Sequence, residues 1–355
     1  MFIVISILIF GLIIAIHEFG HYISAKLFKV GVPEFAIGMG PKILKKQGKE
    51  TLYSLRAIPI GGFCSMDGDD NEEQGEKSLF SKPLWQRIII FASGSVLNIV
   101  AGFLILLLLV STMMPILPTT TLAGFLEGFP LESEQGFQAG DRFHSIDGVR
   151  VYQNANIGML LDMRSSETVD VVVIRDGQRV QLNNLPLERQ TFVNAQGEEE
   201  ELFGFLFERI DQPTFINRVS YTVNNTRDFM RQLPLTIRMF TTGQANLDDV
   251  SSVVGIVDIM NEAGTTAETA GLAVFRLAMI AAIISISVAM VNLLPIPGLD
   301  GGRIFLMIVT TVIERITRRR VNPKVEGYIN TAGLALLFGF MIFIILSDIV
   351  QIAVR

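Results

Sequence analysis

The amino-acid sequence predicts a polytopic α-helical membrane protein with four transmembrane helices, a membrane-associated β-hairpin and an α+β domain outside the membrane. Half of the 355 residues are hydrophobic and only 18% are charged. An average soluble domain contains about 25% charged residues. The hydrophobic residues are concentrated in four long runs, and a polar segment separates the second run from the third. These observations favour a membrane protein with a sizeable polar portion.

The composition excludes three other classes of protein. Disordered chains are poor in hydrophobic residues, and this chain is rich in them. Cys64 is the only cysteine, so a disulfide-stabilised scaffold is excluded. The formal net charge is −6, and the longest run of basic residues is Arg318, Arg319 and Arg320. Nucleic acid is therefore not expected as a partner.

Each predicted transmembrane helix contains about 20 mostly apolar residues, the length needed to cross a bilayer. The helices are expected within residues 1–26, 88–118, 272–302 and 333–355. Lysines and arginines are clustered in two of the connecting loops, residues 27–87 and 303–332. The positive-inside rule places both loops in the cytoplasm. Both termini and residues 119–271 are then expected outside.

The first predicted transmembrane helix contains His17-Glu18-Phe19-Gly20-His21, an H-E-x-x-H motif. Residues four apart lie on one face of a helix, so both imidazoles can bind one metal ion. Zn²⁺ suits imidazole ligands, and Glu18 can act as general base on a zinc-bound water. The alternative is a pair of polar residues at the wet end of a helix, but titratable groups at that depth are costly without a function.

A catalytic zinc ion normally has three protein ligands, so one more ligand must come from elsewhere in the chain. The first and third transmembrane helices are expected to run in the same direction. The cytoplasmic end of the third contains Asp300, which therefore falls at about the depth of the two histidines. Pro295 and Pro297 break the helix there, and such backbone is tolerated where it is buried or lines a wet cavity. We expect Asp300 to be the third ligand; a turn aspartate before two glycines is the alternative.

Residues 35–66 contain two strand-like runs punctuated by glycines, a pattern typical of a β-hairpin. A strand edge near the metal site can pair with an extended peptide. A transmembrane helix must unwind before it is cut, because its carbonyl groups are hydrogen-bonded and shielded. We therefore hypothesise that this hairpin helps to present a substrate as a strand.

Together these motifs resemble the site-2 protease family of intramembrane zinc metalloproteases, and above all its bacterial regulator-of-sigma-E protease branch. The likeness covers nearly the whole chain and includes H-E-F-G-H, N-L-L-P-I-P-G-L-D-G-G and residues 35–41, 53–62, 80–87 and 93–98. It implies that zinc is bound by His17, His21 and Asp300, with Glu18 as the base. It also implies that the substrate strand lies near Asn292, Pro295 and Pro297.

Residues 136–149 resemble the G-x-x-x-G-D-x-I-x-x-I-N-G motif of PDZ domains, and residues 169–175 alternate like a strand before an Asp-Gly turn. One extracytoplasmic PDZ domain is therefore expected at residues 119–190, followed by a connecting region at 191–271. PDZ domains bind extended peptides by strand addition. The expected role is a peptide docking site or a size filter over the protease; a small β domain without a ligand is the alternative.

The predicted function is an intramembrane zinc metalloendopeptidase that performs site-2 proteolysis. The expected substrates are single-span membrane proteins, such as anti-sigma factors or remnant signal peptides. The expected location is the bacterial inner membrane, with the active site near the cytoplasmic face. One alternative is a catalytically silent membrane PDZ scaffold, against which the intact Glu18 argues. Another is a metal transporter, which would need more ionisable residues in the second and fourth helices.

Overall fold

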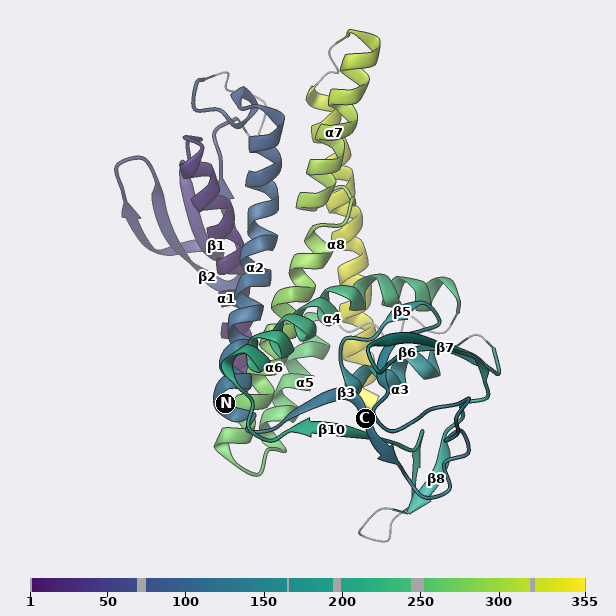
Figure 1. The fold of residues 1–355 in the computed structure, drawn as a ribbon. Helices are drawn as coiled ribbons and strands as arrows, with labels where there is room; N and C mark the ends of the chain where they lie inside the picture. Colours follow the sequence, from purple (N-terminus) through teal and green to yellow (C-terminus); the bar gives the residue numbers. More distant parts are fainter. Residues whose placement is uncertain are drawn as a thin grey trace. The chain divides into compact units, whose positions relative to one another are not determined.

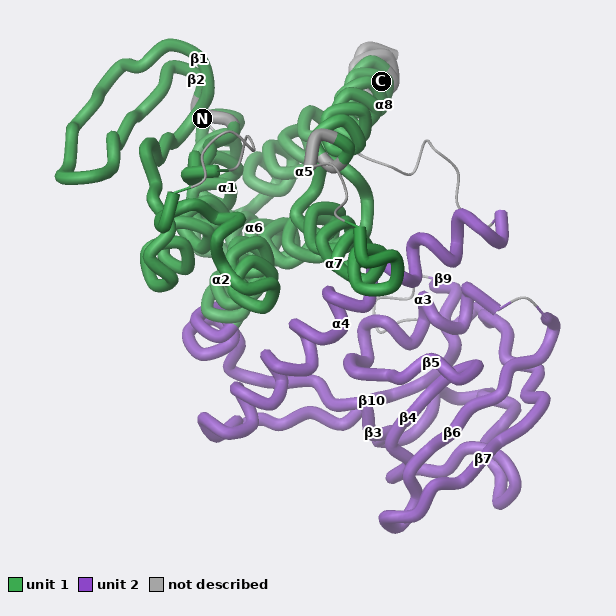
Figure 2. Tube along the Cα trace, turned by 90° about the horizontal axis from the view of Figure 1, so that it is seen from above, with its two compact units in different colours: residues 1–106, 246–355 green, residues 107–245 purple. Residues whose placement is uncertain are grey.

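The computed structural model describes residues 2–68, 75–164, 166–193, 199–243, 252–319 and 323–354, with the backbone alone described at 59–60, 193, 323–324, 326 and 347–354. Arg320 of the predicted cytoplasmic loop lies outside these residues. The chain forms two compact units (Figure 2). Unit 1 comprises residues 1–106 and 246–355, and unit 2 comprises residues 107–245.

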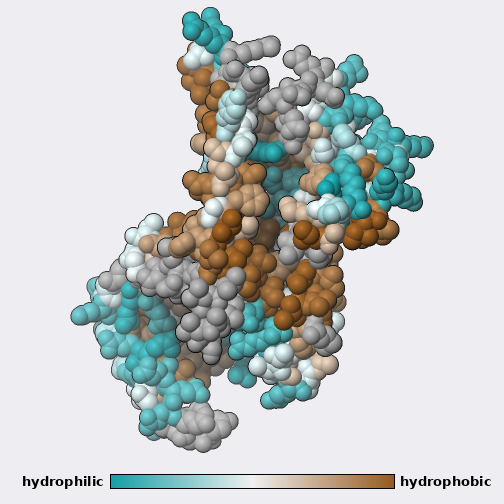
Figure 3. All heavy atoms as spheres, turned by 180° about the vertical axis from the view of Figure 1, so that it is seen from behind, coloured by the Kyte–Doolittle hydropathy of each residue, from teal (hydrophilic) through white to brown (hydrophobic). Residues whose placement is uncertain are grey.

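Four helices are long and apolar enough to cross a membrane, as the sequence predicts (Figure 1). They are α1 (Phe2–Leu27), α2 (Leu84–Met113), α6 (Ala270–Asn292) and α8 (Pro323–Val354), whose apolar part is Gly327–Leu346. Large apolar side chains remain exposed on the outside of these helices, where lipid would cover them (Figure 3). Examples are Leu8 and Leu12 on α1 and Val100 and Leu104 on α2.

The predicted break at the end of the third apolar run is present. Helix α6 ends at Asn292, and α7 (Asp300–Thr317) begins eight residues later. Residues 293–299 between them contain both prolines, and Gly298 adopts a φ of 97°, which a residue with a Cβ rarely tolerates. The predicted helix 272–302 therefore consists of α6, a non-helical connection and the first residues of α7. This connection places Asp300 at a helix N-terminus.

A short helix, α5 (Val253–Thr265), packs against α1 and α6 within unit 1. Its first turn is capped by Ser252, whose side chain accepts a hydrogen bond from the backbone N–H of Val254. The contact buries Phe10 and Ile13 of α1 together with Met260, Leu277 and Ile284. This apolar cluster fixes α1, which carries the two histidines, against the other helices of the unit.

The predicted hairpin consists of two long strands, β1 (Glu34–Gln47) and β2 (Leu52–Ser65), and its pairing is more complex than that of a simple hairpin. Residues 44–47 pair with 52–55 in antiparallel register. Residues 34–37 pair with 52–55 in parallel and with 62–65 in antiparallel register. Each strand therefore folds back across the other. Glycines at positive φ, including Gly38 and Gly61, allow these bends.

Glu34 crosslinks this sheet. Its carboxylate accepts hydrogen bonds from Ser54, Lys42 and Arg56 at 2.7–3.0 Å. Burial opposes the charged form, but the three hydrogen bonds lower the pKa of Glu34 to about 2. The carboxylate is thus charged throughout the physiological range and holds three segments of β1 and β2 together.

Unit 2 is built on a six-stranded sheet with the strand order β10-β3-β4-β6-β7, in which β5 pairs with β4. The strands are β3 (Leu117–Phe125), β4 (Arg142–Ile146), β5 (Val149–Arg150), β6 (Val169–Arg175), β7 (Gln178–Leu185) and β10 (Phe205–Ile210). The unit also contains α3 (Ile157–Asp162), α4 (Phe215–Thr241) and the separate pair β8 (Gln190–Val193) and β9 (Glu199–Leu202). Because β10 pairs with β3, the sheet extends beyond the predicted boundary at residue 190.

One buried ion pair fixes the Gly140-Asp141 turn, which belongs to the motif at residues 136–149. Asp141 is 0% exposed, and its two carboxylate oxygens accept hydrogen bonds of 2.7 Å from Nε and Nη2 of Arg175. The backbone N–H of Gln138 also donates to Asp141 at 2.9 Å. Arg175 in turn donates to the carbonyl oxygen of Gly136. The pair therefore joins the end of β6 to the loop before β4.

We expect Arg175→Met to destabilise unit 2 by about 3 kcal/mol, because removing one partner of a buried ion pair leaves the other charge uncompensated. In the full-length protein, amide hydrogen exchange in β4 and β6 should accelerate by roughly 100-fold. Arg179→Met is the matched control, since Arg179 is exposed on β7. Equal exchange rates in both variants would contradict a stabilising role for the pair.

Candidate metal centre

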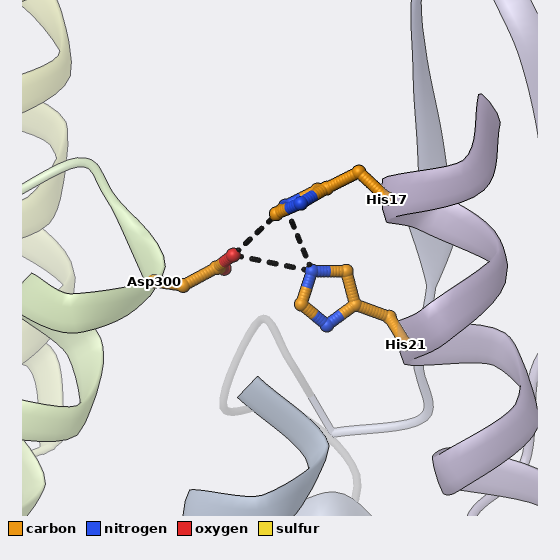
Figure 4. A group of neighbouring side chains, drawn as sticks. All are labelled: His17, His21 and Asp300. Atoms are coloured by element: carbon orange, nitrogen blue, oxygen red, sulfur yellow. Dashed lines mark hydrogen bonds and ion pairs between the residues drawn. The ribbon is translucent and has the colours of Figure 1, made fainter. Parts of the chain in front are cut away.

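His17 and His21 lie one turn apart on α1 and are almost completely buried. Their Nε2 atoms are 3.2 Å apart, and their rings are nearly perpendicular, at 83°. Asp300 approaches from the first residue of α7 (Figure 4). One carboxylate oxygen, Oδ2, lies 3.0 Å from Nε2 of His17 and 3.2 Å from Nε2 of His21. The three residues singled out as metal ligands from the sequence therefore converge on one point.

The separations of these three atoms fit a tetrahedral metal ion. Zinc binds histidine nitrogen and carboxylate oxygen at about 2.0–2.2 Å, so two ligands in a tetrahedron lie roughly 3.3–3.6 Å apart. The observed separations of 3.0 and 3.2 Å require only a small expansion to admit the ion. Two imidazoles and one carboxylate also form the set of donors typical of a catalytic zinc site with one open position.

The backbone of α2 orients the second histidine. Nδ1 of His21 lies 2.8 Å from the carbonyl oxygen of Ile90, so this nitrogen donates its proton and Nε2 keeps a lone pair toward Asp300. Such a second contact is usual for a histidine that binds a metal. Two nitrogens and a carboxylate oxygen within 3.2 Å of one another need a cation or a proton among them. The donor atoms are thus arranged for a positive ion.

Gly94 of α2 provides the space for both rings, a role that no local pattern in the sequence indicates. A Cβ on Gly94 would lie 2.5 Å from Nε2 of His21 and 2.8 Å from the His17 ring. A Cβ on Gly20 would likewise clash with the backbone of Ser93. Ser24 and Ser93 share a hydrogen bond of 2.7 Å at the same crossing. Helices α1 and α2 therefore meet closely through two glycines beside the predicted ligands.

We expect Gly94→Ala to weaken zinc binding by roughly 10–100-fold, the usual effect of disturbing the groups that orient a metal ligand. The added methyl group must displace the imidazoles from their shared position. Gly339→Ala is the matched control, because a Cβ at this glycine of α8 meets nothing within 4 Å. Zinc affinity should be measured by competition with a chelator. Equal affinities in the two variants would contradict this packing role.

A cavity of about 340 Å³ surrounds the three predicted ligands. Glu18, the predicted base, lines it beside His17. Gly62 of β2 packs against Glu18, since a Cβ there would lie 3.2 Å from the Cγ of Glu18. Phe63 and Cys64 also line the cavity. The end of β2 thus reaches the glutamate, which brings the predicted hairpin into the site.

Of the three residues predicted to lie near the substrate strand, one lines the cavity and two do not. Asn292, the last residue of α6, lines the cavity. Pro295 and Pro297 do not line it. Pro295 is exposed, and Pro297 packs against Gly333 of α8, where a Cβ would clash with its carbonyl group. In the structure the two prolines shape the connection between α6 and α7, whereas Asn292 faces the site directly.

Two further residues that line the cavity, Phe91 and Arg303, were not among the predicted site residues. Arg303 follows Asp300 by one turn of α7, and its guanidinium carbon lies 5.3 Å from the centre of the Phe91 ring. Both residues line the cavity. The spacing of three residues after Asp300 placed Arg303 on the same helix face as the predicted ligand, and this signal was available in the sequence.

Buried donors for a metal ion among helices that can cross a membrane, with the carboxylate of Glu18 in the same cavity, are typical of a membrane metallohydrolase. The comparisons with known proteins identify the family. The model of Peptidase family M50 matches residues 5–340. The chain belongs to peptidase family M50, the site-2 protease family, and the predicted membership, zinc metalloprotease activity and zinc cofactor are confirmed.

Several relatives match nearly the whole chain. A protein of Clostridium acetobutylicum named as a zinc metalloprotease is 33% identical over 350 residues, covering 98% of this chain and 97% of its own length. A protein of Clostridium perfringens with the same designation is 32% identical and covers 99% of both chains. The regulator of sigma-W protease RasP of Bacillus subtilis is 26% identical and covers 97% of both chains.

Proposed function

We propose that this protein is an intramembrane zinc metalloendopeptidase that cuts single-span membrane proteins, with His17, His21 and Asp300 as zinc ligands and Glu18 as general base. The observation that carries the proposal is the convergence of α1 and α7. His17 and Asp300 are 283 residues apart in the sequence, but Nε2 of His17 and Oδ2 of Asp300 lie 3.0 Å from each other. Glu18 lines the same cavity. This cavity belongs to the unit that contains the apolar helices.

The roles of the residues follow from their chemistry. Zinc held by these three donors would supply Lewis acidity for the scissile carbonyl group. Glu18 would accept a proton from the attacking water and later give it to the leaving amine, so that one carboxylate serves both steps. Asp300 brings a negative charge to the ligand set. Ile90 keeps the His21 ring in the tautomer that leaves Nε2 available.

The substrate must be extended when it is cut, because the carbonyl groups of an intact helix are hydrogen-bonded. We propose that β2 supports this extended form by pairing with the substrate as an additional strand. Residues 62–65 pair with β1 along one edge, and Phe63 and Cys64 reach the cavity. Asn292 would contact the substrate strand there, and the connection at residues 293–299 leaves backbone outside any helix nearby.

The proposed orientation follows the positive-inside rule. We place residues 27–87, which contain β1 and β2, in the cytoplasm together with residues 303–332, which contain most of α7 and the start of α8 rather than the predicted loop. Both termini and residues 119–271 then lie outside. The metal centre is then near the cytoplasmic face of a bacterial inner membrane. Unit 2 contains the predicted PDZ domain, which would either dock a peptide or exclude bulky substrates. Anti-sigma factors and remnant signal peptides are compatible with a domain that docks a peptide and with one that excludes bulky substrates. The name of RasP links one relative to control of a sigma factor.

The proposal is tested by reconstituting the purified full-length protein with a model single-span substrate. We expect cleavage within the apolar segment of the substrate, loss of cleavage with a zinc chelator, and recovery when zinc is returned. A protein that binds zinc but cuts no membrane substrate would instead support the catalytically silent scaffold. Cleavage unaffected by complete removal of zinc would contradict the mechanism.

A further inference from the structure

One face of the β1–β2 sheet forms two cross-strand rows. Phe35 and Lys46 both pair with Tyr53, and Ile37 and Leu44 both pair with Leu55. The members of the two rows are two residues apart along each strand, so all six side chains project from the same face. The second row is entirely aliphatic, and the first ends in a lysine. This arrangement makes an apolar surface with a positive edge.

Helix α1 covers only the inner part of this face. Tyr22 packs on Phe35 at a ring separation of 5.3 Å, and its hydroxyl lies 2.6 Å from that of Tyr53. The second row is left open, with Ile37 37%, Leu55 43% and Leu44 63% exposed. A groove of about 310 Å³ runs over this part. In Figure 3 the sheet lies at the right, where hydrophobic and hydrophilic side chains are adjacent.

Two lysines at the groove have no ion-pair partner in the described part of the chain. Lys45 and Lys46 both line the groove. Lys42 on the same strand is paired with Glu34 at 2.9 Å. Lys26 and Lys77 are both paired with Glu50. Because side chains alternate along a strand, Lys46 projects from the same face as Leu44, whereas Lys45 projects from the opposite face. Lys46 therefore leaves one unpaired positive charge beside the open apolar groove.

We propose that this groove binds an anionic phospholipid, with an acyl chain along the row Ile37–Leu55–Leu44 and the phosphate against Lys46. An uncovered aliphatic row next to an unpaired ammonium group matches an amphiphile with a negative headgroup. An extended peptide is a poorer match, because strand addition uses the main-chain groups at a sheet edge, whereas this groove lies on the sheet face. The inference is independent of the proteolytic function.

The test is native mass spectrometry of the full-length protein in detergent, titrated with phosphatidylglycerol or with phosphatidylcholine of the same acyl chains. A lysine near an anionic headgroup contributes about fivefold in binding, so Lys46 predicts a preference of roughly fivefold for phosphatidylglycerol. Lys46→Gln should remove this preference. Lys45→Gln, which makes the same change of charge on the opposite face of the sheet, should retain it.

Leu44→Ser tests the apolar part of the site and carries little risk to folding, because Leu44 is largely exposed. It should lower the binding of both lipids. Equal binding of the two lipids by the wild type would overturn the proposal, and so would a preference that survives Lys46→Gln. Displacement of phosphatidylglycerol by inorganic phosphate alone would show a phosphate site without a lipid, which also contradicts it.

Discussion

Glu18→Gln should reduce cleavage of a reconstituted single-span substrate by about 10²–10⁴-fold, the usual contribution of a positioned general base. Glutamine has nearly the shape of glutamate but cannot accept the proton of the attacking water. Glu18 is not one of the three converging donors, so zinc should remain bound at one ion per chain. The expected result is therefore an inactive protein with a full complement of zinc.

The two readouts distinguish a catalytic role from a structural one. Zinc content and the melting temperature should match those of the wild type, because the cavity keeps its shape. If Glu18→Gln loses zinc together with activity, Glu18 serves the metal site rather than the water. If cleavage continues at the wild-type rate, another group is the base and the proposed mechanism is wrong.

Asp300→Asn should weaken zinc binding by at least about 100-fold, since disturbing a group that only orients a metal ligand already costs about 10–100-fold. The substitution replaces a charged oxygen donor by a neutral amide at 3.0 Å from His17 and 3.2 Å from His21. Cleavage should fall in parallel and recover partly at high zinc concentration. Competition with a chelator gives the affinity, and the same samples give the activity.

Asp258→Asn is the matched control, because Asp258 is a carboxylate on α5 of the same unit and does not line the cavity. It should keep the zinc affinity and activity of the wild type. A loss of zinc as large in this control as in Asp300→Asn would indicate a general effect of removing charge. Retention of zinc by Asp300→Asn would require a different third ligand.

The convergence of the three proposed ligands could be predicted from the sequence, because the signals for it are local or depend only on depth. His17 and His21 are four residues apart on a helix, and this spacing alone places their rings on one face. Asp300 could be predicted as the third ligand because two parallel apolar runs of similar length end at the same depth. Neither step required knowledge of side-chain packing, and the structure brings the three donors together.

Features that depend on packing between distant segments were not predictable in this way. The role of Gly94 depends on which face of α2 meets α1, and a uniformly apolar helix gives no signal for this. The pairing of β3 with β10 joins strands about 80 residues apart, so the sheet extends past the boundary expected from the local motif. The double pairing of residues 34–37 likewise depends on bends at glycines.

The most direct test of the central claim is mass spectrometry of the product formed from a single-span substrate in ¹⁸O-labelled water. The account predicts a cut inside the apolar segment, one ¹⁸O atom in the new carboxylate, and almost no product from Glu18→Gln. A cut outside the apolar segment, or the same labelled product from Glu18→Gln, would contradict it.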